Sequence, residues 1–213
     1  MAVICPTVTA FTTREYREQI TRIQGFATRI HIDFMDGYFA PTTSIAIKDA
    51  WWQPGPAVDL HVMYQKPLEH IEDLVALKPH MIIIHSEADQ PAAFLGELDG
   101  LGIKKGLALL KATQVEDVKD LIVMVDHVLI FSGDLGHFGG TADMEMLKKI
   151  ALLKQLKPSL EIGWDGGINV ENAQALMKGG VDILNTGGYI QNATDPEAAY
   201  DTLVAVLKRG SDG

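Results

Sequence analysis

The sequence predicts one α/β domain, residues 1–213, folded as a closed (β/α)8 TIM barrel. Short apolar runs alternate with longer amphipathic segments along the whole chain, and this alternation is typical of a parallel sheet whose strands are joined by helices. Eight such runs can be counted, which is the number of strands in a barrel of this type. A chain of 213 residues is also long enough to form one continuous core.

The expected strands are rich in Ile, Val and Leu, as strands buried on both faces of a parallel sheet should be. They are Ala2–Val8, Ala27–Ile32, Ala57–Val62, Met81–His85, Lys105–Leu110, His127–Phe131, Leu160–Trp164 and Val181–Asn185.

The expected helices carry apolar residues three or four positions apart, which matches the helical period. The clearest are Arg14–Gln24, Leu68–Leu77, Met144–Leu156 and Ala198–Leu207. Helix-capping residues mark several ends: Thr12 or Thr13 precedes the first of these segments, and Asp143 precedes the third. An open doubly wound sheet is the competing architecture, but it often has a G-x-G-x-x-G fingerprint after the first strand, and none follows Val8 here.

Composition and charge exclude several classes of protein. The chain has 18 Lys+Arg and 28 Asp+Glu, a formal net charge of −10, which argues against a general nucleic-acid binder. An apolar content of 47% excludes a disordered chain. The single cysteine, Cys5, cannot form an internal disulfide and fits a reducing cytoplasm. The first residues lack the pattern of a signal peptide, and no apolar run approaches the roughly 18 residues of a membrane span, so a cytoplasmic protein is expected.

Histidines and carboxylates lie at the ends of three expected strands. The second run contains His31 and is followed by Asp33, the third contains His61, and the seventh ends before Asp165. Because the carboxyl ends of all strands surround one mouth of a barrel, these four side chains are expected to converge there. Two imidazoles and two carboxylates suit Zn²⁺, Mn²⁺, Fe²⁺ or Co²⁺. A single His or Asp at a strand end is also a common structural hydrogen-bond partner or loop cap, so the pattern alone leaves both interpretations open.

Glycine pairs follow each of the last three expected strands, as Gly139-Gly140, Gly166-Gly167 and Gly187-Gly188. Glycine lets main-chain N–H groups approach a ligand closely, and barrels often hold phosphate in the loops after strands 7 and 8. The pattern favours a phosphate cradle, although Gly-Gly is also common in tight turns.

These segments together resemble the ribulose-phosphate 3-epimerase family. HIDFMDGYFAP is similar to the second-strand signature of that family, DLHVM to the third and IIIHSEA to the fourth. HFGG resembles its phosphate loop, and WDGGIN its seventh-strand motif. Order and approximate spacing agree from Cys5-Pro6-Thr7 to Gly188.

The resemblance implies an isomerase of carbohydrate metabolism, acting in the pentose phosphate pathway or nearby. It implies one divalent metal ion held by residues matching His31, Asp33, His61 and Asp165. It further implies that Asp33 and Asp165 are the catalytic acid and base, which epimerise C3 of D-ribulose 5-phosphate, or of a related pentulose or hexulose phosphate, through an enediolate. The substrate contacts implied are Thr7, Met35, Met63, His137, Phe138, Gly139, Gly140, Gly166, Gly167, Gly187 and Gly188.

The chain departs from the family pattern around the substrate. Thr7 stands where Ser is usual, Leu110-Lys111 replaces Asn-Pro, and Gly187-Gly188 replaces Gly-Ser. The loop SGDLGHFGGTAD lacks the usual proline and glutamine. The expectation is therefore preserved chemistry on an unspecified ketose phosphate.

Two other functions remain open from sequence. One is a related sugar-phosphate lyase, which is disfavoured because Met35 stands where a decarboxylating relative carries lysine. The other is a catalytically silent sugar-phosphate binder. The expected partner in each case is a small sugar phosphate, with neither nucleic acid nor membrane, and the family resemblance implies a homo-oligomer.

Overall fold

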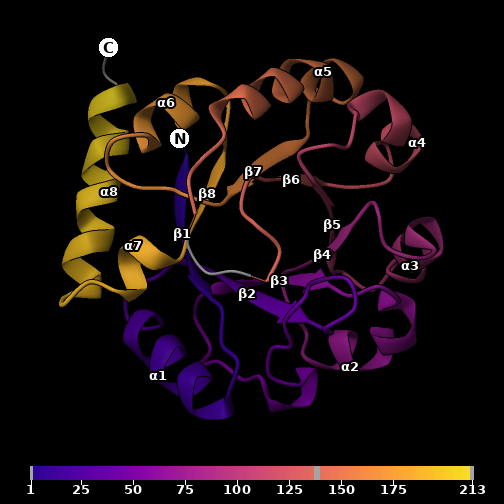
Figure 1. The fold of residues 1–213 in the computed structure, drawn as a ribbon, viewed down its shortest axis with the longest axis horizontal. Helices are drawn as coiled ribbons and strands as arrows, with labels where there is room; N and C mark the ends of the chain where they lie inside the picture. Colours follow the sequence, from indigo (N-terminus) through magenta and orange to yellow (C-terminus); the bar gives the residue numbers. More distant parts are fainter. Residues whose placement is uncertain (1, 137–139, 212–213) are drawn as a thin grey trace.

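Eight parallel strands form a closed barrel in the computed structural model, which describes residues 2–136 and 140–211. Each strand pairs with its neighbours in sequence, and β8 pairs with β1 to close the ring. The predicted (β/α)8 barrel is thereby confirmed, and an open sheet is excluded. Figure 1 shows the strands enclosed by the helices. The strands are β1 (Val3–Val8), β2 (Arg29–Met35), β3 (Ala57–Met63), β4 (Met81–His85), β5 (Lys104–Leu109), β6 (His127–Phe131), β7 (Glu161–Asp165) and β8 (Ile183–Thr186).

The helices that connect the strands are short, and several begin with a 3₁₀ turn. None of the helices in the described ranges combines the length and hydropathy that crossing a bilayer requires. The α-helices are α1 (Thr13–Ile23), α2 (Ile71–Ala76), α3 (Pro91–Glu97), α4 (Lys119–Ile122), α5 (Lys148–Leu156), α6 (Ala173–Lys178), α7 (Gly188–Gln191) and α8 (Pro196–Ser211). The 3₁₀ helices are η1 (Ile47–Asp49), η2 (Pro67–His70), η3 (Val115–Val118) and η4 (Met144–Leu147).

The capping signals read from the sequence are present. Thr12 caps α1: its hydroxyl accepts from the Glu15 amide, while the Glu15 carboxylate accepts from the Thr12 amide. The Asp143 carboxylate accepts from the Glu145 amide at the start of η4. These bonds satisfy amides that have no partner within the helix, so the loops enter each helix at a defined angle.

The barrel interior is layered along its axis. A buried ion network lies at the amino-terminal ends of the strands, where Arg29, at 8% exposure, binds Asp59 (Nε to Oδ2, 2.6 Å) and Glu161 (Nη2 to Oε2, 2.8 Å). His127 Nδ1 lies 2.8 Å from the same Glu161 oxygen. Burial opposes the charge on Arg29, but Glu161 and Asp59 outweigh it and raise the pKa of Arg29. Bonds from His127 and Arg29 outweigh burial and lower the pKa of Glu161, so the Arg29–Glu161 pair is ionised.

An apolar layer separates this network from the opposite end of the barrel. It is formed by inward-facing residues of β4, β5 and β6, all of which are fully buried. Its members are Met81, Ile83, Ala108 and Leu129. Beyond this layer, the carboxyl-terminal end of the barrel carries the polar side chains of Asp33 and Asp165 together with the apolar Met35, Met63 and Phe131.

Candidate active site

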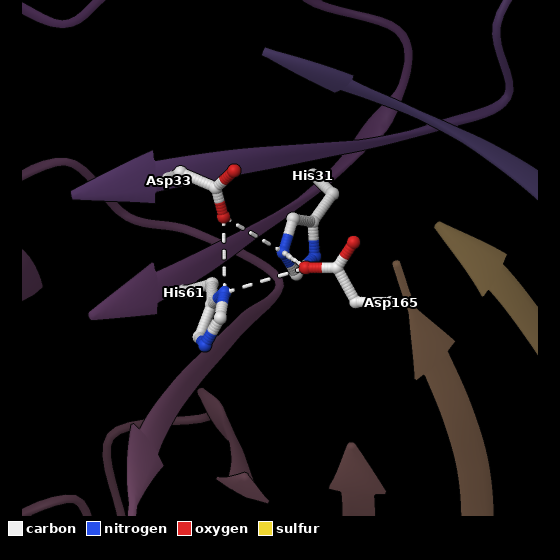
Figure 2. Close-up of side chains that lie close together, drawn as sticks. All are labelled: His31, Asp33, His61 and Asp165. Atoms are coloured by element: carbon white, nitrogen blue, oxygen red, sulfur yellow. Dashed lines mark hydrogen bonds and ion pairs between the residues drawn. The ribbon is translucent and has the colours of Figure 1, made fainter. Parts of the chain in front are cut away.

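Four side chains meet at the carboxyl-terminal end of the barrel. His31 and Asp33 are two residues apart on β2, so alternation along the strand points both into the barrel. His61 lies on β3 opposite Asp33, and Asp165 ends β7. Figure 2 shows the four side chains pointing toward one another. His61 Nδ1 is 2.9 Å from Asp33 Oδ1 and 3.8 Å from Asp165 Oδ2, and His31 Nε2 is 3.2 Å and 3.8 Å from the same two oxygens.

This geometry fits a bound divalent cation. One donor atom from each residue lies within 4.8 Å of all the others. Four tetrahedral ligands about 2.0–2.1 Å from one Zn²⁺ lie about 3.3 Å from one another, so shifts of about half an ångström in the separations between these atoms would suffice. Both ring nitrogens of His31 are buried without a hydrogen-bond partner among the described residues. A buried polar atom normally has a partner, and a cation at this point would supply one for Nε2.

The two carboxylates have opposite electrostatic surroundings. Burial works against ionisation of Asp33, but the His31 and His61 rings beside its carboxylate outweigh burial and lower the pKa of Asp33. Burial, and then the negative charge of Asp33, raise the pKa of Asp165 well above its ordinary value. Burial lowers the pKa of His61 to about 3 despite Asp33, so its ring is neutral at pH 7 and able to act as a ligand.

Two residues outside the four-residue cluster support these ligands. The Thr9 hydroxyl donates to Asp33 Oδ2 at 2.6 Å. His85, at the end of β4, contacts the far side of His61, with the two Nε2 atoms 2.9 Å apart. A signal for both was available, because Thr9 follows Thr7 at the spacing of one strand face and His85 ends its strand.

A cavity of about 310 Å³ opens beside the four side chains. Asp33 and Asp165 line it, whereas His31 and His61 lie fully buried. Of the substrate contacts expected from sequence, the cavity is lined by Thr7, Met35, Met63, Gly140, Gly166, Gly167, Gly187 and Gly188. The remaining three, His137, Phe138 and Gly139, lie outside the described residues.

The cavity has further polar lining that the sequence analysis missed. Asn185 of β8 is 2% exposed, and neither its amide nitrogen nor its amide oxygen has a partner within the described chain. The Thr7 hydroxyl is also buried and has no hydrogen-bond partner within the described chain. Buried polar atoms of this kind are normally satisfied by water or by a ligand. No sequence motif marks Asn185, because a polar residue in an apolar strand gives no spacing signal by itself.

The loops after β6 and β7 meet through their main chains. A methyl group added at Gly166 would lie 2.3 Å from the Gly133 amide nitrogen, and one at Gly167 would lie 2.1 Å from the Ala142 amide nitrogen. Both glycines also have positive φ, at 112° and 70°, where a side chain is strained. The glycines are therefore required for loop packing here, and both line the cavity.

The loop that follows β5 is held from two sides. Lys149 of α5 donates to the carbonyl oxygens of Leu110 (2.8 Å) and Thr113 (2.7 Å). Glu87, which follows β4, accepts from the Leu110 amide and the Thr113 hydroxyl. Lys111 points to solvent, with its ammonium 4.0 Å from the Asp134 carboxylate. These bonds fix the conformation of the loop after β5, in which Leu110-Lys111 stands where the family that the sequence resembles usually has Asn-Pro.

Fold and site together define a barrel enzyme with a possible metal centre and a small glycine-lined cavity at its carboxyl-terminal mouth. The family model "Ribulose-phosphate 3 epimerase family" matches residues 3–191. The chain belongs to the ribulose-phosphate 3-epimerase family.

Relatives of similar length carry the same description. A ribulose-phosphate 3-epimerase of Helicobacter pylori is 31% identical over 183 residues, covering 82% of this chain and 84% of the relative. One from Aquifex aeolicus is 27% identical over 216 residues and covers 97% of each chain. One from Mycobacterium tuberculosis is 26% identical over 215 residues, covering 97% of this chain and 92% of the relative.

Solved structures of lower identity share the fold. A 3-hexulose-6-phosphate synthase from Salmonella typhimurium superposes with a TM-score of 0.70 at 13% identity, covering 98% of this chain and 99% of the other. A phosphoribosyl anthranilate isomerase from Thermococcus kodakaraensis superposes with a TM-score of 0.66 at 15% identity, covering 98% and 99%. At this level of identity, the likeness concerns the barrel alone.

Proposed function

We propose that this chain epimerises a ketose phosphate at C3, with Asp33 and Asp165 as the acid/base pair and a divalent cation at the four-residue cluster. The observation that carries the proposal is the meeting of these two carboxylates with His31 and His61 beside one cavity. D-ribulose 5-phosphate is the first candidate substrate, and other pentulose or hexulose phosphates are the alternatives.

Inversion at C3 requires a proton to leave one face of the carbon and return to the other. Asp33 comes from β2 and Asp165 from β7, with β8 and β1 between them in the barrel wall, so they reach the cavity from different sides. One carboxylate removes the C3 proton, and the other donates a proton to the opposite face. A cation bound at the cluster supplies positive charge that stabilises the enediolate oxygens. The Thr9 hydroxyl keeps Asp33 oriented while it gains and loses the proton.

The phosphate is expected at the glycine-lined side of the cavity. Gly166, Gly167, Gly187 and Gly188 line the cavity there, and the main-chain N–H groups of glycine-rich loops can bind an anion without a cationic side chain. This suits a chain whose net charge is −10. Thr7 and Asn185 are the proposed partners of sugar hydroxyls, and Met35 and Met63 are proposed to pack against the sugar. The choice among Zn²⁺, Mn²⁺, Fe²⁺ and Co²⁺, the homo-oligomeric state and the cytoplasmic location stay predictions.

Stereochemistry provides the direct test of the proposed reaction. The protein is incubated in deuterated water with a panel of ketose phosphates, and both C3 deuterium incorporation and the C3 epimer are followed by NMR. One member of the panel should exchange at C3 and invert. Thermal stabilisation by a sugar phosphate without exchange would instead identify a silent binder, and carbon–carbon cleavage would identify a lyase.

Chelation should abolish turnover, and Zn²⁺, Mn²⁺, Fe²⁺ or Co²⁺ should restore it. Metal binding should also release protons, because Asp165, whose pKa is raised in the metal-free site, must ionise to become a ligand. Metal affinity should therefore fall as the pH is lowered from neutrality. Calorimetric titration of the metal-free protein in buffers of different ionisation enthalpy measures the proton release. Full activity after chelation would contradict the metal-dependent mechanism.

Gly166→Ala should weaken substrate binding more than it slows the chemical step. The added methyl group would collide with the Gly133 amide and push the β6 and β7 loops apart, which displaces the phosphate subsite, whereas Asp33 and Asp165 are held in strands β2 and β7. The expected result is a KM increase larger than the fall in kcat. Gly25→Ala is the matched control, because nothing lies within 4 Å of its added methyl group. Unchanged kinetics for Gly166→Ala would remove this loop from the phosphate site.

A further inference from the structure

A chain of polar contacts extends behind His61, on the side away from the proposed metal. His61 uses Nδ1 to face Asp33 and Asp165, while its Nε2 lies 2.9 Å from Nε2 of His85. His85 is fully buried at the end of β4, the strand that pairs with β3. Its Nδ1 lies 3.4 Å from Glu87 Oε2.

The Glu87 carboxylate is anchored at its other oxygen. Oε1 accepts from the Leu110 amide and the Thr113 hydroxyl, which leaves Oε2 directed toward His85. Neither Glu87 Oε2 nor His85 Nδ1 has another hydrogen-bond partner in residues 2–136 and 140–211. The rings of Phe39 and Phe131 pack against His85, with centroid distances of 4.7 and 5.7 Å, and supply no competing acceptor. A small rotation would bring the pair to normal hydrogen-bonding distance.

Only one proton can lie between the two Nε2 atoms, and its position decides which nitrogen of His61 is free. If His61 carries the proton on Nε2, its Nδ1 has a free lone pair for a cation. His85 then accepts at Nε2 and carries its own proton on Nδ1, where it faces the Glu87 carboxylate favourably. In the reverse order, His61 Nδ1–H donates to Asp33, and the bare Nδ1 of His85 faces the negative charge of Glu87. Asp33 therefore favours one order and Glu87 favours the other.

We propose that His85 and Glu87 are positioning residues that hold His61 in the tautomer whose Nδ1 can bind the metal ion. Neither residue lines the substrate cavity or reaches the reacting carbon. Their effect is to orient the His61 ring and to raise the electron density at Nδ1 through the chain from Glu87 to His85 to His61. The inference rests on the proposed metal site and assigns the residues that tune it.

The tautomers of His61 and His85 can be determined in the unsubstituted protein. In ¹⁵N-labelled, Zn²⁺-loaded protein, two-bond ¹H–¹⁵N NMR spectra distinguish the protonated nitrogen of each neutral histidine. The proposal expects His61 protonated at Nε2 and His85 protonated at Nδ1. A proton on His61 Nδ1, or on His85 Nε2, in the loaded protein would overturn it.

Metal affinity provides the second test, measured by competition between the protein and a chromophoric Zn²⁺ chelator. His85→Leu should weaken Zn²⁺ binding by about 10–100-fold, which is the usual effect of removing the partner of a ligating histidine. His85→Gln should recover part of that loss, because its amide oxygen can accept from His61 Nε2–H. Glu87→Gln should also weaken binding, since a neutral amide replaces the carboxylate.

Control variants distinguish this relay, the contacts from Glu87 through His85 to His61, from a packing role of the same residues and from failure of the metal site itself. His80→Gln removes a half-buried histidine directly before β4, away from the site, and should leave the Zn²⁺ affinity unchanged. Thr113→Val removes one of the two hydrogen bonds that anchor Glu87 Oε1, without touching His85, and should have a smaller effect than Glu87→Gln. His61→Ala should lower metal content. Equal Zn²⁺ affinity of His85→Leu and the unsubstituted protein would refute the relay, whereas absence of Zn²⁺ binding by the unsubstituted protein would refute the metal site on which it rests.

Discussion

An Asp165→Asn variant should lose epimerisation by about 10²–10⁴-fold while it still exchanges the C3 proton of one epimer. The carboxylate of Asp33 remains, and it can remove a proton from the face it reaches and return a deuteron to that same face. The missing step is donation from the opposite side, which Asn cannot perform. The measurement is the deuterium content of each epimer, separated after incubation in deuterated water at saturating metal.

Asp33→Asn is the mirror experiment and should retain exchange only in the other epimer. Metal content of both variants must be measured in parallel, because each substitution also replaces a charged ligand by a neutral one. Normal turnover by Asp165→Asn would contradict the two-carboxylate mechanism. If Asp165→Asn keeps its metal but exchanges the C3 proton of neither epimer, the assignment of Asp33 as an independent base is contradicted.

Arg29→Met should lower the free energy of unfolding by about 3–5 kcal/mol at pH 7, the usual cost of breaking a buried ion pair. The substitution leaves Asp59, at 1% exposure, and the partly buried Glu161 without their guanidinium partner. Urea unfolding followed by circular dichroism measures the change. Arg14→Met is the matched control: Arg14 pairs with Glu18 on the exposed face of α1, and its loss should produce no measurable shift.

The stability loss should depend on pH in a defined direction. Because the folded-state pKa of Glu161 is lowered, its contribution is fully present above the ordinary carboxyl range and disappears as the pH falls through the folded-state value. The difference between the unsubstituted protein and Arg29→Met should therefore narrow in acid. A difference that stays constant from neutral pH to strongly acidic pH would show that Arg29 stabilises the barrel through packing of its aliphatic stem rather than through its charge.

Most of the barrel could be predicted because parallel strands and amphipathic helices leave strong local patterns. The runs Met81–His85 and His127–Phe131 coincide with β4 and β6. The predicted second strand, Ala27–Ile32, begins and ends too early, because β2 runs from Arg29 to Met35 and includes Asp33. Alternating charged residues on its inner face interrupt the apolar run that marks a buried strand.

The four-residue cluster could also be predicted, because strand alternation and barrel closure place its members without any knowledge of side-chain angles. Strand position also marks Thr9 and His85 as facing the barrel, but which ligand each of them contacts could not be predicted. The bond from Thr9 to Asp33 and the approach of His85 to His61 depend on register between neighbouring strands, and register is set by the closed sheet as a whole. Arg29 shows the same limit: its partner Glu161 lies 132 positions away in sequence. Buried pairs of this kind carry no local pattern.

The contact between the β6 and β7 loops has a consequence for how this scaffold can diversify. Gly166 and Gly167 approach main-chain atoms of the preceding loop, so this close approach depends on the two glycines and not on which side chains that loop carries at the contact. Mutations that change the neighbouring side chains can accumulate without disrupting the contact between the β6 and β7 loops, provided the two glycines remain. Selection for a new sugar can thus act on the rim of the pocket while the catalytic end of the barrel stays intact.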